Sequence, residues 1–217
     1  NDTAFLAELR AERVITPAHA DYAEWKPLRA RLDADWRESF TERHLMRQSE
    51  IAPGRMFTAM FLHGDSGHLI GNMIFLVILG LAVETVLGSV GFLVFYLLAG
   101  LGGGLFSLGW RWGDVGGMLG ASGAIAGLMG AFAVLWGQRR VRLFYWFFVI
   151  FDYTRVRALW LLPVWFGWEF VQLLMAPDAG VGFDAHAGGI LSGAALAFAA
   201  TKLGRVNLAY LDEEDIR

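Results

Sequence analysis

The sequence predicts an all-α, polytopic bundle of membrane helices. Of its 217 residues, 56% are apolar, whereas soluble domains have about 45–50%. The apolar residues gather in long runs after residue 55, and most of the 27 glycines lie inside these runs, where membrane helices use glycine for close backbone approach. We therefore expect a polar, helical N-terminal extension at 1–55, a membrane domain at 56–205 and a polar C-terminal tail at 206–217.

Residues 2–10 and about 21–48 are expected to form polar or amphipathic helices. Neither segment is long enough and apolar enough to cross a bilayer. The second carries apolar residues at steps of three and four, which predicts a stripe that packs on a neighbouring element. These residues are Trp25, Leu28, Leu32 and Trp36.

Five later segments have the length and composition of membrane spans, since a span needs roughly 20 apolar residues. They are about 68–87, 91–108, 121–136, 158–175 and 185–203. A further apolar and aromatic segment, 141–151, is too short to span. We expect it to be interfacial or re-entrant, because aromatic residues favour the membrane interface.

Basic residues mark one end of these spans. They are Arg139, Arg140 and Arg142 after the third span, Arg155 and Arg157 before the fourth, and Lys202 and Arg205 at the end of the fifth. The positive-inside rule places those ends in the cytoplasm. The opposite, extracytoplasmic ends of spans one, three and five then bring together His68, Ser122 and His186.

Ser122 lies in the run Gly120-Ala121-Ser122-Gly123, at the predicted start of a helix. A lone serine is usually only a small residue at a helix contact. Here the flanking glycines uncover its hydroxyl, and the free N–H groups of a helix start favour a developing negative charge. These features make Ser122 a candidate nucleophile.

A serine nucleophile needs a base, and His186 begins the fifth span. Gly189 and Gly193 follow on the histidine's own helix face, with the same four-residue spacing as Gly123 and Gly127. Two faces of small residues allow two helices to pack closely. Such packing could bring the imidazole within hydrogen-bond reach of the serine.

His68 and Asn72 share a helix face, because they are four residues apart. Both can donate hydrogen bonds, so the pair suits either a structural role or an oxyanion site better than a metal site. The His-Glu-x-x-His metalloprotease pattern is missing, since Leu69 follows His68. The chain has no cysteine, and we expect neither a metal nor a cofactor. Ala124 breaks the Gly-x-Ser-x-Gly pattern of α/β-hydrolases.

Three motifs resemble the signatures of rhomboid proteases, in the family's order. They are His68-Leu-Ile-Gly-Asn72, Gly120-Ala-Ser122-Gly123 and Ala185-His186-x-x-Gly189-x-x-x-Gly193. The run Gly80-x-x-x-Glu84-x-x-x-Gly88 also resembles a helix motif of that family. The resemblance covers about 56–203.

The resemblance implies an intramembrane serine endopeptidase that cleaves membrane-protein substrates in or near their transmembrane segments. It implies a dyad without a third acid, with Ser122 as nucleophile and His186 as base. The implied oxyanion site comprises His68, Asn72, the Ser122 N–H and Gly120. The resemblance also makes Glu84 a structural residue that bonds to a loop, and it places Trp165, Phe166 and Trp168 on the lateral gate helix.

The sequence departs from the family in its first part. The family core has six spans, so we expect a first span upstream of Asn1, with residues 1–50 as an elongated first loop. The family's Trp-Arg pair in that loop is absent, and only Arg55 lies near its place. Compact size and the resemblance indicate a bacterial inner membrane, with the active site facing the extracytoplasmic side.

Two other functions remain open. A rhomboid-like pseudoprotease would bind membrane proteins without cleaving them, but such proteins lack the dyad. A small transporter would place polar residues near mid-bilayer or in paired broken helices. The expected partners are transmembrane protein substrates and the lipid bilayer. A net charge of −3, without a long basic run, gives nucleic-acid binding no support.

Overall fold

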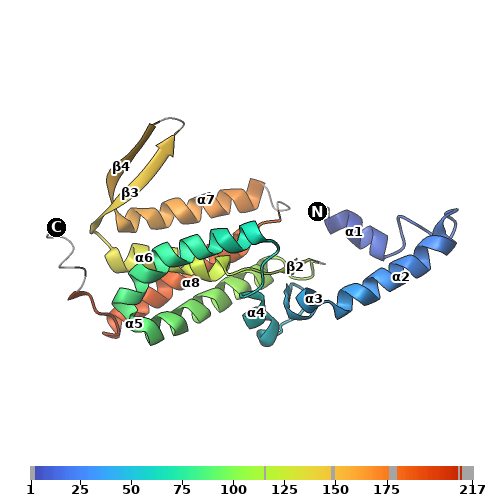
Figure 1. Ribbon diagram of the computed structural model, residues 1–217, viewed down its shortest axis with the longest axis horizontal. Helices are drawn as coiled ribbons and strands as arrows, with labels where there is room; N and C mark the ends of the chain where they lie inside the picture. The colour runs from blue at the N-terminus through green and yellow to red at the C-terminus, as the bar shows by residue number, and fades with distance from the viewer. Residues whose placement is uncertain (1–2, 115, 148–149, 176–179, 210, 212–217) are drawn as a thin grey trace.

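The computed structural model describes residues 3–114, 116–147, 150–175, 180–209 and 211, and it has two parts (Figure 1). Four helices form a bundle: α5 (Ser66–Trp110), α6 (Ser122–Trp136), α7 (Leu161–Met175) and α8 (Phe183–Lys202). At one end lie the four helices of the N-terminal part, α1 (Thr3–Arg10), α2 (Tyr22–Glu38), α3 (Phe40–His44) and α4 (Pro53–Ala59). The short strands β1 (Met46–Arg47) and β2 (Gly117–Met118) pair with each other, and a β-hairpin lies at the other end.

Helix α5 contains two of the predicted spans. Its 45 residues are broken at Gly88, whose φ of 69° and ψ of 160° suit glycine alone. The chain folds back there, so the two halves run side by side (Figure 1). A Cβ on Gly80 would lie 3.3 Å from the Phe92 ring of the other half. The halves correspond to the predicted spans 68–87 and 91–108.

Three helices of the described chain are long and apolar enough to cross a membrane, namely Ser66–Trp110, Ala158–Met175 and Phe183–Lys202. The second of these consists of the 3₁₀ turn η1 (Ala158–Trp160) followed by α7. Helix α6 is apolar too, but it has only 15 residues. The predicted helical membrane bundle is therefore confirmed.

The centre of the bundle is α6, which packs directly on α8. A Cβ on Gly189 would meet the backbone of Gly123, and a Cβ on Gly193 would meet the backbone of Gly127. The second half of α5 also lies close to α8, because a Cβ on Gly103 would lie 2.7 Å from the Ala185 carbonyl oxygen. Small residues thus allow the close packing that the two glycine pairs predicted.

The described residues of the segment 141–151 form β-strands, which argues against the re-entrant alternative, and the interfacial alternative stays a prediction. The segment lies in a β-hairpin of β3 (Arg140–Phe147) and β4 (Ile150–Arg157), which projects from the bundle (Figure 1). The antiparallel register runs from Arg140 opposite Arg157 to Phe147 opposite Ile150. The β-branched and aromatic residues of this segment favour a strand, and the Arg142 guanidinium lies 4.7 Å from the centre of the Tyr153 ring across the two strands.

The N-terminal extension differs from the prediction in two respects. The helix expected over 21–48 ends at Glu38, because Ser39 is extended and its hydroxyl accepts a hydrogen bond from the Glu42 N–H at the start of α3. The predicted packing of the apolar stripe is wrong as well. Leu28 is 60% exposed and Trp36 is 51% exposed, since α2 points away from the bundle (Figure 1).

Candidate active site

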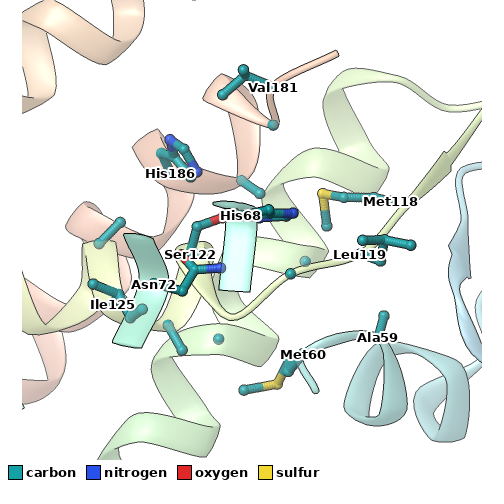
Figure 2. A pocket seen from close by; sticks show the side chains of 18 of the residues that line it. Ala59, Met60, His68, Asn72, Met118, Leu119, Ser122, Ile125, Val181 and His186 are labelled. Carbon is teal, nitrogen blue, oxygen red and sulfur yellow. The ribbon is translucent and has the colours of Figure 1, made fainter. Parts of the chain in front are cut away.

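A cavity of about 580 Å³ lies at the end of the bundle next to α4. Its walls come from the five helices α4 to α8 and from segments that connect the elements, and Figure 2 shows His68, Asn72, Ser122 and His186 among the side chains around it. The polar residues that line it are Asp65, His68, Asn72, Ser122, Glu169 and His186. Four of the predicted site residues, His68, Asn72, Ser122 and His186, are therefore together in one cavity.

Ser122 is the first residue of α6, and the segment before it is held by the N-terminal region. Strand β2 pairs with β1, with Met46 opposite Met118. The Gly120 N–H then donates a hydrogen bond to the Ala59 carbonyl at 2.9 Å. This anchoring fixes the start of α6, where the N–H groups of the first turn have no acceptor within the helix.

The imidazole of His68 lies against the backbone of Gly120. A Cβ on Gly120 would lie 3.0 Å from His68 Nε2 and 3.5 Å from Ser122 Oγ. His68 Nε2 and Ser122 Oγ therefore both lie close to the same side of Gly120. His68 Nδ1 accepts a hydrogen bond from the Gly64 N–H at 3.4 Å, so the neutral ring carries its proton on Nε2, as a donor beside Ser122.

Asn72 is buried, yet its amide nitrogen Nδ2 has no hydrogen-bond partner among the described residues. A buried amide donor without a partner is costly. Figure 2 shows the Asn72 side chain close to Ser122 in the cavity. The unused donor can therefore serve a group bound there, such as a carbonyl oxygen that gains negative charge.

The structure corrects the predicted role of Gly120. Its N–H group already donates to Ala59, so it is not a donor for an oxyanion. Its φ of 132° and the His68 ring against its Cα instead explain why the position requires glycine. The donors of the cavity are then His68 Nε2, Asn72 Nδ2 and the N–H groups at the start of α6.

His186 lies in the first turn of α8, across the cavity from Ser122 (Figure 2). The two helix starts touch, since a Cβ on Gly123 would lie 3.5 Å from the Ala185 carbonyl oxygen. The hydrogen bond expected between the serine and the imidazole is not among the contacts of the described residues. The imidazole instead bonds through Nδ1 to Glu169 Oε2, at 3.0 Å, which leaves Nε2 for the cavity.

Gly123 also lines the cavity, whereas the remaining predicted residues lie outside it. Glu84 accepts a hydrogen bond from the Ser89 hydroxyl at 2.5 Å, beside the break at Gly88. Gly189 and Gly193 form the helix contact described above. On α7, Trp168 is 63% exposed and Phe166 stacks on Phe170. None of the three predicted gate residues, Trp165, Phe166 and Trp168, lines the cavity.

Two charged residues near the site were not identified as candidates from the sequence. One is Glu169, the only charged residue of α7. The other is Asp184, which is 1% exposed and accepts hydrogen bonds from the Ser107 hydroxyl and, at 3.1 Å, from Arg111 Nε. The signal for both was available, because an ionisable residue within or at the end of a membrane span is a functional candidate by default.

A second, more polar cleft of about 950 Å³ adjoins the cavity. It lies between the N-terminal helices and the bundle, and shares His68, Met118 and Leu119 with the cavity. Charged residues of both parts line it, among them Arg37, Glu42 and Arg111. The cleft extends from the candidate site to these charged residues. Among the described residues, no cluster of three or more His, Cys, Asp or Glu side chains could hold a metal ion.

The long apolar helices and their bundle define an integral membrane protein of the helical, multi-pass class. A family model, the rhomboid domain, matches residues 52–203, which is well over half of the chain. The chain therefore belongs to the rhomboid family, whose members are usually intramembrane serine proteases and act on membrane proteins in the bilayer. No curated protein gives a significant match to the chain.

Proposed function

We propose that this protein is an intramembrane serine endopeptidase that cleaves transmembrane protein substrates with Ser122 and His186. The observation that carries the proposal is the shared cavity. It joins a serine at a helix start, a histidine on the neighbouring helix and a buried Asn72 amide without a partner. A hydroxyl, a base and unused donors are the parts that acyl transfer requires.

The reaction begins when Ser122 Oγ attacks the carbonyl carbon of the substrate peptide bond. Nε2 of His186 accepts the hydroxyl proton, and the carbonyl oxygen becomes an oxyanion. This oxyanion accepts hydrogen bonds from Asn72 Nδ2, His68 Nε2 and the Ser122 N–H. The bond from carbon to nitrogen then breaks, and the His186 imidazolium gives its proton to the leaving amine.

Water completes the cycle by hydrolysing the ester between Ser122 and the substrate. His186 takes a proton from the attacking water, and the ester bond breaks to release the serine and a carboxylate product. The polar cleft beside His68 supplies a route for this water. The exposed apolar face of α7, with Val164, Trp168 and Leu174, offers lipid-side contact to a substrate helix.

In the same proposal, 56–205 is the protease domain and 1–55 is its first loop. The basic end of the bundle faces the cytoplasm of a bacterial cell, and the cavity opens to the extracytoplasmic side. These assignments depend on the positions of Arg139, Arg140 and Lys202 at one end of the spans.

The test is cleavage of a model transmembrane substrate by the full-length protein in detergent, beside Ser122→Ala and His186→Ala. We expect cleavage by the wild type and its loss in both variants. Cleavage that persists in Ser122→Ala would refute the nucleophile. A wild type that binds transmembrane segments but cleaves none, across several substrates, would favour a pseudoprotease instead.

A further inference from the structure

Glu169 is a carboxylate in an otherwise apolar helix, and it faces the candidate site. Helix α7 contains no other charged residue, and its exposed residues are apolar, among them Val164, Val171 and Leu174. Glu169 instead lines the cavity, with a side chain that is 19% exposed. Because an ionisable group in a membrane span is costly, its position calls for a partner and a role.

The partner is His186. Glu169 Oε2 lies 3.0 Å from His186 Nδ1, and the imidazole itself is 16% exposed. A carboxylate can only accept a hydrogen bond, so Nδ1 of the ring must carry a proton. Nε2 is then the unprotonated nitrogen of the neutral ring. That is the tautomer that a base needs in order to accept a proton from Ser122.

We propose that Glu169 is a positioning residue for the reaction, and that the site works as Ser122, His186 and Glu169 rather than as a dyad. The inference depends on the proposed function. Glu169 fixes the tautomer and the orientation of the imidazole, and its charge stabilises the imidazolium that forms during attack. Because Glu169 and His186 lie on different helices, the base is oriented only while α7 packs on α8.

Other charged groups near His186 have different partners. From α5, His68 and Asp65 face the same cavity, but His68 bonds to Gly64 and Asp65 caps the helix through the His68 N–H. Asp184, on the histidine's own helix, bonds to Ser107 and Arg111. From α6 the ring faces Ser122, which carries no charge. Among the described residues, Glu169 is therefore the carboxylate that bonds to the base.

The experiment compares the full-length wild type with Glu169→Gln, Glu169→Asp and Glu169→Ala. Gln172→Ala is the matched control, because Gln172 is a partly buried polar residue on α7 that does not line the cavity. Two rates are measured between about pH 5 and 9. One is cleavage of a transmembrane substrate, with kcat and KM separated. The other is labelling of Ser122 by a small fluorophosphonate, which does not depend on how a substrate helix enters.

We expect Glu169→Gln to lower kcat and the labelling rate by about 10²-fold or more with little change in KM, because the amide can donate to Nδ1 and favour the wrong tautomer. The pH dependence of both rates should also differ from that of the wild type. Glu169→Asp should recover part of the rate, and Gln172→Ala should resemble the wild type.

Thermal unfolding of each variant checks that it is folded, and the Asp variant keeps the test valid where Ala fails to fold. A cleaving wild type whose rate and pH profile are unchanged in Glu169→Gln would overturn this inference alone. So would an equal loss in Gln172→Ala, which would indicate a general effect of altering α7. A folded wild type that neither cleaves nor labels would overturn the proposed function, and the inference with it.

Discussion

Replacing Gly193 by alanine tests the packing that brings the two catalytic candidates together. A Cβ at this position would lie 2.6 Å from both the Cα and the carbonyl carbon of Gly127, and closer still to the carbonyl oxygen. Non-bonded carbon atoms pack at about 3.5–4.0 Å, so the backbones of α6 and α8 must separate by about 1 Å. Overpacking of this kind costs about 1–3 kcal/mol of stability.

The same separation moves His186 away from Ser122, since Ser122 begins α6 and His186 lies in the first turn of α8. A misplacement of about 1 Å can cost about 10²-fold in rate. We therefore expect Gly193→Ala to lower both the thermal midpoint, Tm, of the protein in detergent and the kcat for substrate cleavage. Gly109→Ala is the control, because a Cβ there meets nothing within 4 Å. A Gly193→Ala protein with the Tm and kcat of this control would refute the close contact.

Three further predictions concern single side chains. Asn72→Ala should lower kcat by about 10²–10³-fold with little change in KM, and steady-state kinetics that show a rise in KM alone would contradict its role as a donor. Asp184→Asn should lower the Tm, because weakening one side of a buried charge pair costs up to about 3–5 kcal/mol; an unchanged Tm would contradict this. Burial, and then the nearby His68, lower the pKa of His63. As the pH falls through about 6.5, His63 therefore binds a proton more readily in the unfolded chain than in the folded chain. Stability should fall as the pH drops below about 6.5, and this fall in Tm should be shallower in His63→Gln.

The membrane bundle was predictable because its signals are local. Apolar length alone located the five segments, and the boundary between the first two lies at the break that the structure shows at Gly88. The motif around Ser122 and the spacing of Gly189 and Gly193 also gave the right helix contact. These patterns depend on periodicity along one helix, which sequence reveals directly.

The errors came from features that the pattern of a single segment does not determine. The apolar segment 141–151 had no helical or strand period that decided its structure, and its described residues pair as antiparallel strands. The stripe on α2 was expected to pack, but nothing in its own sequence shows whether a neighbour is present. Gly120 was expected to offer its N–H, which the structure commits to Ala59, some sixty residues earlier.

Glu169 illustrates the same limit within the site. Its carboxylate could be identified from the sequence as unusual in a span, but its contact with His186 depends on the rotation and register of α7 against α8. Those are set by tertiary packing, in which only Leu161 and Leu173 of α7 are buried. The family resemblance favoured a dyad, and the contact between Glu169 and His186 became visible only in the structure.

In the proposed reaction, the short length of α6 determines the depth of the nucleophile in the membrane. Its 15 residues rise about 22 Å, whereas the hydrocarbon core of a bilayer is about 30 Å thick. Arg139 and Arg140 follow the last turn of α6 and fix that end near water. Ser122, at the other end, must then lie about 8 Å below the opposite surface of the hydrocarbon core. A serine at that depth can hydrolyse a peptide bond only if water reaches it, and the cavity with its polar cleft beside His68 meets this requirement.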